Sequence, residues 1–359
     1  MWEIDLEALE SIAIGAGILG TGGGGNPYIG KLRAKRLLEQ GRRVTIVDPA
    51  ELPDDAYVVS VGGMGAPTVG IEKIEKGDES YRALRALERH AGVRAAAVIS
   101  GEIGGANCIE PMIVAALAEL PLVDADGIGR AFPELQMVTF FIYGVSPSPA
   151  ALADEKGNEV VFDRVLDSFW LERIARGITS EMGGAAGYAF ALMRAEEMRR
   201  TAIPHTLSLA RRIGDAVREA RRARRDPVLA VLDTTPGRVL FEGKIVDVLR
   251  WTTRGFARGT VTLAGSGPDQ GSQLVIDFQN ENLVARRDGE VVAVVPDLIC
   301  ILDTVDAQPI TTEVLRYGFR VRVLVLPAPP QLCTPEALRV VGPRAFGYDV
   351  EPPGHTSGR

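Results

Sequence analysis

The chain has 359 residues, a length that predicts about two domains of roughly 150 residues each. Hydrophobic residues make up 46% and charged residues 24%, which excludes disorder over most of the chain because enough apolar material is present to offset chain entropy. The net charge of −7 argues against a protein that binds the phosphate backbone of nucleic acids. The one basic cluster, at residues 211–225, is interrupted by Asp215 and Glu219, which predicts the exposed face of a helix.

The cysteines and the absence of targeting segments indicate the compartment. Cys108, Cys300 and Cys333 are widely spaced, which excludes a disulfide framework and a four-thiolate zinc site and is typical of a reducing cytoplasm. The first residues do not contain a cationic segment followed by an apolar core, and no uncharged apolar run reaches the ~18 residues of a membrane span. We therefore expect a cytoplasmic protein without a secretory signal or a membrane segment.

Helices and apolar strands alternate in the first part of the chain. Asp5 and Asn26 are suitable N-caps for two of the helices, and Pro27 suits a first helical turn. Near-continuous apolar strands between helices predict a parallel sheet that is covered on both faces. The expected helices are 5–16, 27–40, 80–91 and 111–119, and the expected strands are 43–48, 57–61, 95–100 and 122–124.

The later part of the chain has a different pattern. From about residue 237 apolar and polar residues alternate, and Asp288-Gly289 between two such runs is a hairpin signal. We predict an α/β N-terminal domain with a mainly parallel sheet and glycine-rich loops at residues 1–168, and a β-rich α+β C-terminal domain at residues 169–359. The further expected strands are 136–145, 160–162, 188–193, 260–263, 273–278, 283–287, 291–295 and 320–326, and the further helices are 167–179 and 207–224.

A run of glycines opens the helix that starts at Pro27 and is the first candidate site. Consecutive glycines let backbone amides converge on one point, and a helix N-terminus adds partial positive charge, which suits a carboxylate, a phosphate or a developing oxyanion. No Gly-Lys-Ser/Thr ending follows, so a P-loop is excluded and a nucleotide-dependent enzyme is disfavoured. A tight structural turn is the alternative. The expected substrate-binding residues of this loop are Gly22, Gly23, Gly24, Gly25 and Asn26.

The second candidate is the turn at residues 101–108, directly after an apolar strand. Glu102 is a candidate general base whose pKa burial would raise, and Asn107 is a candidate substrate-binding residue. Cys108, near a helix N-terminus, is a candidate nucleophile. The alternative for Cys108, which we favour, is a small buried apolar side chain.

The third candidate is the acidic loop at residues 123–134. Strand alternation places Asp124 and Asp126 on the same side, where they could hold a divalent cation, share a proton or anchor Arg130. Arg130 could bind a substrate carboxylate with two hydrogen bonds, and Glu134 is a further substrate-binding candidate. A buried salt-bridge network is the alternative for this loop.

These segments resemble the S-methyl-thiohydantoin desulfurase-like family, which was formerly a domain of unknown function and is associated with hydantoin utilisation. The resemblance rests on residues 19–27, 101–107 and 124–134, and on the C-terminal segments 295–299 and 341–348. It extends from about residue 5 to 350. The resemblance implies an N-terminal α/β domain, a distinct C-terminal domain and a heterocyclic substrate.

The expected activity is that of a hydrolase acting on a hydantoin-like five-membered ring, such as desulfuration of S-methyl-thiohydantoin. Glu102 or Asp126 would be the base and the other the acid, the glycine amides would stabilise negative charge, and Arg130 would orient the substrate. A metal-assisted version would use Asp124 and Asp126 to hold a divalent cation; no other cofactor is expected. The alternative is a non-catalytic ligand-binding or accessory subunit of a hydantoinase-type system. The expected partner is a small heterocyclic substrate, and a homo-oligomer is left open. In the catalytic interpretation the three loops meet in one cleft.

Overall fold

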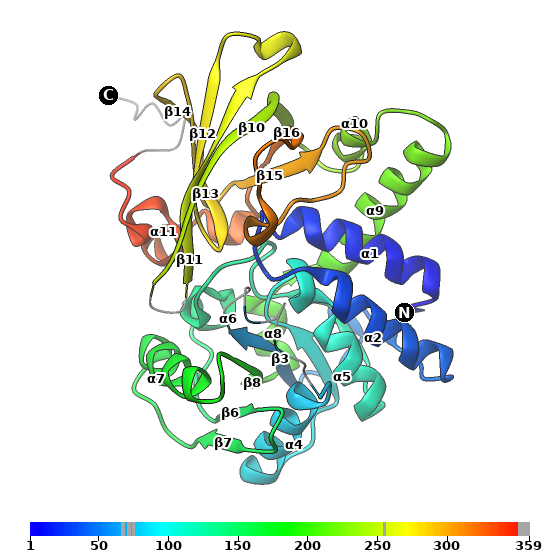
Figure 1. Ribbon diagram of the computed structural model, residues 1–359. Helices are drawn as coiled ribbons and strands as arrows, with labels where there is room; N and C mark the ends of the chain where they lie inside the picture. The colour runs from blue at the N-terminus through cyan, green and yellow to red at the C-terminus, as the bar shows by residue number, and fades with distance from the viewer. Residues whose placement is uncertain (66–68, 70–72, 74–75, 254–255, 351–359) are drawn as a thin grey trace.

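The computed structural model describes residues 1–65, 69, 73, 76–253 and 256–350. Within these residues the chain forms two sheets, which Figure 1 shows one above the other with α1 beside them. The first has nine strands in the order β1-β2-β5-β4-β3-β8-β6-β7, with β9 paired to β5. The strands of this sheet are β1 (Trp2–Glu3), β2 (Thr45–Val47), β3 (Tyr57–Gly65), β4 (Ala97–Ser100), β5 (Leu122–Asp126), β6 (Ala150–Ala153), β7 (Glu159–Phe162), β8 (Ala185–Arg194) and β9 (Ile203–Pro204).

The second sheet is antiparallel, and its described part has seven strands in the order β14-β13-β12-β11-β10-β16-β15. In the first sheet β2, β5, β4 and β3 are parallel neighbours, and the strands outside them are antiparallel. The predicted fold class, an α/β part followed by a β-rich part, is confirmed. The strands of the second sheet are β10 (Arg238–Thr253), β11 (Phe256–Gly265), β12 (Gln273–Gln279), β13 (Glu281–Arg287), β14 (Glu290–Val294), β15 (Leu298–Asp303) and β16 (Arg320–Leu326).

The first two helices begin where their capping residues predict. The Asp5 side chain accepts a hydrogen bond from the amide of Ala8 (2.7 Å), and the Asn26 side chain accepts one from the amide of Tyr28 (2.9 Å). None of the described helices is long and apolar enough to cross a bilayer. The helices are α1 (Leu6–Leu19), α2 (Pro27–Glu39), α4 (Glu79–Ala91), α5 (Glu110–Ala118), α6 (Thr139–Ile142), α7 (Ser168–Glu181), α8 (Ala195–Thr201), α9 (Thr206–Arg222), α10 (Pro227–Leu232) and α11 (Pro335–Val341).

The strand predicted at residues 136–145 is wrong. This segment forms a 3-10 turn, η3 (Leu135–Met137), followed by α6, in which the amide of Ile142 donates to the carbonyl of Val138 (3.1 Å). The amide of Thr139 donates to the carbonyl of Gly127 (2.6 Å), so the segment is fastened to the loop after β5 instead of to a strand. A short apolar run has the same composition in a buried helix and in a strand, so this pattern could not distinguish the two.

The first sheet continues beyond the domain boundary predicted at residue 168. β8 pairs antiparallel with β3 and β6, and β9 pairs with β5, so the change of sheet comes between Pro204 and Arg238. The local sequence around residue 168 does change character, but β8 after it pairs with β3, more than a hundred residues earlier. Pairing at that sequence separation has no local signature.

α1 and α9 cross with their backbones in close contact, and glycine permits the approach from both sides. A Cβ on Gly15 would lie 1.9 Å from the carbonyl oxygen of Ala210, and a Cβ on Gly214 would lie 1.8 Å from the carbonyl oxygen of Ser11. α1 also contacts the second sheet, because Cys300 Sγ of β15 donates to the carbonyl of Ile18 (3.1 Å). α1 therefore links the two sheets, and the loop that follows it lies between them.

We predict that Gly15→Ala and Gly214→Ala each lower the free energy of unfolding by about 1–3 kcal/mol, because the added methyl group meets rigid backbone. Gly177→Ala in α7 is the matched control, since its Cβ would meet nothing within 4 Å. Removing a helical glycine there should raise stability by about 0.5–1 kcal/mol. Urea unfolding followed by circular dichroism measures all three. Equal stabilities for the three variants would contradict the proposed close crossing.

Candidate functional site

The glycine-rich loop after α1, the turn after β4 and the end of β5 meet at one edge of the first sheet. β4 and β5 are parallel neighbours, so their carboxyl ends lie at the same edge. The amide of Ile103, just after β4, donates to Asp126 Oδ2 at the end of β5 (2.8 Å). A Cβ on Gly24 would lie only 2.3 Å from the carbonyl oxygen of Gly104. The structure thus brings together the three segments that the sequence singled out.

Glu102 is a buried carboxyl group, and both of its oxygens accept hydrogen bonds. Oε1 accepts from Asn107 Nδ2 (2.7 Å), and Oε2 accepts from the amide of Phe132 (3.0 Å). The Asn107 side chain is held in turn by both backbone groups of Gly63 in β3 (2.8 and 3.1 Å). Burial and, to a smaller extent, the charge of Asp126 raise the pKa of Glu102 to about 7, against the lowering effect of these bonds. Glu102 can therefore gain or lose a proton near neutral pH.

Asp126 is fully buried and is fixed through one oxygen. Its Oδ2 accepts from the backbone amides of Ile103 (2.8 Å), Ile128 (3.0 Å) and Gly129 (2.7 Å). Its Oδ1 is buried and has no hydrogen-bond partner. Burial raises the pKa of Asp126 to about 7, although the amides and the nearby Thr206 hydroxyl lower it. Asp126 therefore presents one free oxygen whose protonation state also changes near neutral pH.

A third carboxyl group, Glu281, reaches this place from the second sheet. β12 and β13 are joined at Asn280, whose φ of 57° makes a tight turn, and Glu281 is the first residue of β13. A Cβ on Gly23 would lie 2.0 Å from Glu281 Oε1, so the carboxyl group packs directly on the glycine loop. Glu281 is only 2% exposed, and its Oε2 has no hydrogen-bond partner. Burial raises the pKa of Glu281 well above its usual range, and the charge of Glu102 adds to this effect.

Sequence reasoning missed Glu281 because residues 279–282 lie between two alternating strands and have the composition of an exposed turn. The signal that could have identified it is the absence of glycine among four consecutive polar residues, since exposed two-residue hairpin turns favour Asn-Gly or Asp-Gly. All four side chains are buried in the structure. A polar turn that is buried needs partners. Asn280 Oδ1 accepts from the amide of Ala257 in the same half, whereas the amide of Asn282 donates to the carbonyl of Thr21 in the other half of the molecule.

Tyr188 in β8 was also missed, and nothing in the local sequence marks it. Its hydroxyl lies against the backbone of two glycines, because a Cβ on Gly62 or on Gly101 would be 2.4 or 2.5 Å from it. Burial raises the pKa of Tyr188 well above its usual value, and the charge of Glu102 contributes. The phenol is therefore neutral at physiological pH and lies near Glu102.

The guanidinium group of Arg130 donates its hydrogen bonds to groups within the protein. Nε donates to the carbonyl of Ala131 (3.1 Å), and Nη1 donates to the carbonyls of Pro296 (2.9 Å) and Asp297 (2.8 Å). Nη2 donates to Thr21 Oγ1 (2.8 Å) and, across the boundary between the sheets, to the carbonyl of Asn282 (3.3 Å). These five bonds match the five N–H donors of arginine, and the side chain is 0% exposed. The geometry therefore makes Arg130 a link between the two halves and leaves no donor for a substrate.

The glycine loop is held from both sides by backbone hydrogen bonds. The carbonyl of Gly22 accepts from the amide of Thr312 in the C-terminal part (2.8 Å), and the carbonyls of Gly24 and Gly25 accept from the amide of Ala106 (2.9 and 3.0 Å). Positive φ angles at Gly22, Gly24 and Gly25 suit glycine. The carboxyl group packed against this loop is Glu281.

Cys108 and Asp124 lie in surroundings that favour structural roles. Cys108 is 0% exposed in the apolar core, where burial raises the pKa of its thiol far above the usual value and keeps it neutral. The Asp124 carboxylate accepts from the amide (3.0 Å) and the hydroxyl of Ser208 and so caps α9. Across the described residues no group of three or more His, Cys, Asp or Glu side chains is arranged to hold a metal ion.

Glu134 lies toward α7, with different neighbours. Burial raises its pKa, and its charged neighbours are Glu172, Arg176 and Arg258. Arg176 Nη2 donates to the carbonyl of Pro133 (2.9 Å), which fastens this end of the acidic loop to α7. The loop thus contributes Asp126 to the buried carboxyl cluster, and Glu134 to a contact with α7.

Two family models match the chain, one in its N-terminal and one in its C-terminal part. The model described as "S-Me-THD-like, N-terminal domain" matches residues 7–164, and the one described as "S-Me-THD-like, C-terminal domain" matches residues 166–353. The chain belongs to the S-Me-THD-like family. This confirms the resemblance seen in the sequence, and the family's name connects its members with thiohydantoins.

A crystal structure of a protein from Chromobacterium violaceum is similar to this S-Me-THD-like chain. It has 26% sequence identity and a TM-score of 0.79, and the match covers 97% of this chain and 98% of the other. A search of curated proteins found no match.

The carboxyl cluster of this S-Me-THD-like protein is closed to solvent. Glu102, Asp126 and Glu281 are 6%, 0% and 2% exposed. The described residues form a groove of about 650 Å³ elsewhere, between α7 and the β6–β7 hairpin, and none of the three lines it. The three carboxyl groups are therefore not accessible from this groove in the described conformation.

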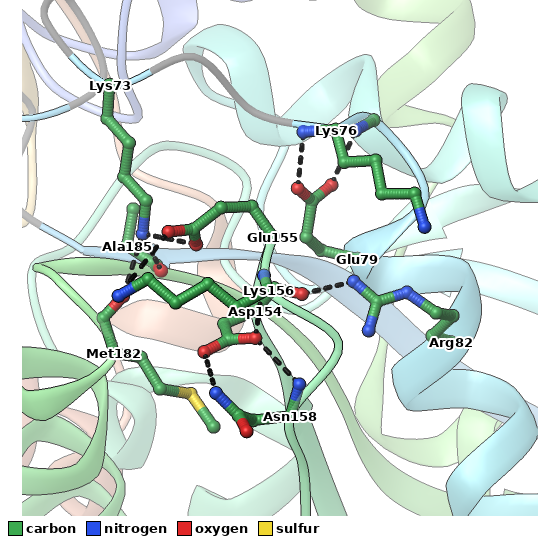
Figure 2. A network of polar contacts seen from close by, with 11 residues as sticks. Lys73, Lys76, Glu79, Arg82, Asp154, Glu155, Lys156, Asn158, Met182 and Ala185 are labelled. Atoms are coloured by element: carbon green, nitrogen blue, oxygen red, sulfur yellow. Dashed lines mark hydrogen bonds and ion pairs between the residues drawn. The ribbon is translucent and has the colours of Figure 1, made fainter.

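The groove adjoins a polar network that Figure 2 shows from close by. Lys73 Nζ contacts Glu155 (2.7 Å) and the carbonyls of Met182 (2.8 Å) and Ala185 (3.0 Å). Arg82 donates to the carbonyl of Asp154 in the same turn. These bonds fasten the β6–β7 turn to the start of β8. None of the residues of this network belongs to the buried cluster of Glu102, Asp126 and Glu281.

We predict that stability falls as pH rises from about 5 to about 7 and that Glu102 contributes to the fall. The folded pKa of about 7 exceeds the ordinary 4.5, so between these values the unfolded chain has released a proton that the folded chain retains. At 1.36 kcal/mol per unit the contribution is about 3 kcal/mol. Urea unfolding at several pH values should show a smaller fall in Glu102→Gln.

Glu290→Gln, on the exposed start of β14, is the control and should behave like the wild-type protein. An undiminished fall in Glu102→Gln would mean that Glu102 is ionised throughout this pH range in the folded state.

Proposed function

We propose that the protein is a hydrolase that replaces the methylthio sulfur of an S-methyl-thiohydantoin, or of a related five-membered heterocycle, with oxygen. The observation that carries this proposal is the pair of buried carboxyl groups, Glu102 and Asp126, which the Ile103 backbone joins and whose pKa values both lie at about 7. Family membership supports the substrate class.

The reaction requires an activated water molecule and protons for two heteroatoms. Water adds to the ring carbon that bears sulfur, and a carboxylate of the pair takes one of its protons. The C–S bond then breaks, and the same pair returns that proton to the departing sulfur, which leaves as methanethiol. A carboxyl pair with pKa values near the working pH suits both directions of transfer.

Asp126 is the better placed base of the two. Its Oδ1 is free, whereas both Glu102 oxygens already accept hydrogen bonds. Three amides hold Asp126 Oδ2, so the free oxygen keeps a fixed direction. Glu102, oriented by Asn107, is then the partner that shares the proton with Asp126.

The non-catalytic alternative, a ligand-binding or accessory subunit of a hydantoinase-type system, is favoured by one observation. The cluster is enclosed, and all the donors of Arg130 are used within the protein, which is the pattern of a structural ion network. The two functions differ in what the loss of one carboxylate does to the protein.

We predict that Asp126→Asn lowers the turnover of S-methyl-thiohydantoin by about 10²–10⁴-fold, because the amide cannot accept the proton. Released thiol is measured for the purified protein with and without a chelator, and unfolding is measured on the same samples. Asp124→Asn is the matched control from the same strand, because it weakens a helix cap and should cost about 1 kcal/mol of stability without changing the rate of the folded protein.

The accessory interpretation predicts the opposite pattern. The wild-type protein would release no thiol from any of the hydantoins and thiohydantoins tested, and Asp126→Asn would act on the melting temperature alone.

A further inference from the structure

Glu281 differs from the other two carboxyl groups in origin and in contacts. It stands at the tip of the β12–β13 hairpin, in the part of the chain that supplies no residue to the proposed Glu102–Asp126 pair. Its Oε1 packs on Gly23, while its Oε2 is buried and accepts and donates no hydrogen bond. A buried polar atom without a partner is costly, so its presence in a polar site calls for an explanation.

The hairpin tip is held firmly in this position. The amide of Asn282 donates to the carbonyl of Thr21 (2.8 Å), and Asn282 Nδ2 donates to the carbonyl of Ile299 (2.9 Å). Thr312 Oγ1 donates to the carbonyl of Asn280 (2.6 Å). Glu281 is thus placed by hydrogen bonds to both of its neighbours in the chain, and its carboxyl group is held at the glycine loop.

The surroundings of Glu281 favour the neutral acid over the carboxylate. Burial raises its pKa well above the usual range and the charge of Glu102 adds to the effect, against the lowering effects of Arg130 and of the backbone groups of Glu281 and Gly24. The five hydrogen bonds of Arg130 go to other groups, so the guanidinium does not pair with Glu281 directly. A protonated carboxyl group with one free oxygen is a proton donor.

We propose that Glu281 is a catalytic residue, the general acid that protonates the ring nitrogen of the substrate while water adds to the neighbouring carbon. The proposal rests on the proposed function and assigns the proton that the Glu102–Asp126 pair does not supply. The site would then combine residues of both sheets, with the base from the first sheet and the acid from the second.

The protons balance over the reaction. As water adds to the carbon of the C=N bond, Asp126 takes one water proton and Glu281 gives its proton to the ring nitrogen. When the C–S bond breaks, the proton on the Glu102–Asp126 pair goes to the sulfur. The hydroxyl group on the ring carbon then becomes a carbonyl group and returns its proton to Glu281, so both acids end as they began.

Glu281→Gln tests this assignment by its rate and its pH profile. We expect turnover to fall by about 10²–10⁴-fold with the fold retained by circular dichroism. We also expect the wild-type rate to decline as Glu281 ionises with rising pH, and this decline to disappear from the residual activity of the variant. A Glu281→Gln rate within twofold of the wild-type rate would overturn the proposal.

Gly23→Ala tests the placement of the acid without removing it. The methyl group would lie where Glu281 Oε1 lies, so the carboxyl group must shift and turnover should fall by at least tenfold. Gly30→Ala in α2 is the matched control, because its nearest neighbour would be 3.6 Å away, and it should retain wild-type turnover. Equal activity of the two variants would contradict the proposed role.

Infrared titration tests the proton on Glu281 without any turnover. We expect one band of a protonated buried carboxyl group that persists above the pH at which exposed carboxyl groups ionise in the wild-type protein and is lost in Glu281→Gln. It should remain in Glu313→Gln, the control at a second buried carboxyl group of the same part of the chain whose pKa burial also raises. Loss of the band in Glu313→Gln instead would overturn the assignment.

The outcomes separate this proposal from the proposed function. A wild-type protein that turns over no thiohydantoin or hydantoin overturns the proposed function and the acid role with it. A wild-type protein that turns over the substrate while Glu281→Gln matches its rate overturns only the role of Glu281.

Discussion

The burial of the Arg130 guanidinium is the constraint on which the rest of the interior depends. A fully buried cation is tolerated only when its donors are satisfied, and here four carbonyls and one hydroxyl satisfy them. These acceptors come from the glycine-rich loop, the β12–β13 hairpin, the segment before β15 and the acidic loop itself. One side chain therefore holds together segments from both sheets, and the position of each segment follows from its place around that side chain.

The same burial explains the acids around the arginine. Three carboxyl groups lie in an interior that solvates ions poorly, and each has a raised pKa because burial disfavours its charged form. The positive charge of Arg130 offsets part of that cost for Glu102 and Glu281 by electrostatic attraction, while its hydrogen bonds go to carbonyl and hydroxyl groups. Glu102 and Asp126, with pKa values of about 7, therefore exchange protons near neutral pH, which exposed carboxylates would not do.

Glycines allow segments of this interior to approach one another closely. At Gly23 and Gly24 the missing side chain admits the Glu281 carboxyl group and the Gly104 backbone, and at Gly62 and Gly101 it admits the Tyr188 hydroxyl. The two helices that support the loop cross through a second pair of glycines, Gly15 and Gly214. The loop is therefore closely packed between the two sheets, and its Gly23 lies against the Glu281 carboxyl group. This explains why the site is closed.

The sequence by itself determined the local elements and the family. Caps such as Asp5 and Asn26 act within a few residues, and the apolar runs of β3 and β4 can be recognised in the sequence. Most helices and strands and the three loop segments could therefore be predicted. The roles of Arg130, Glu281 and Tyr188 could not be predicted, because each depends on partners brought from distant parts of the chain. The same is true of β8, which pairs with β3 across more than a hundred residues and carries the first sheet beyond the predicted boundary. Periodicity and capping are short-range effects, whereas burial, and with it every raised pKa in the cluster, exists only once the two sheets have closed on each other.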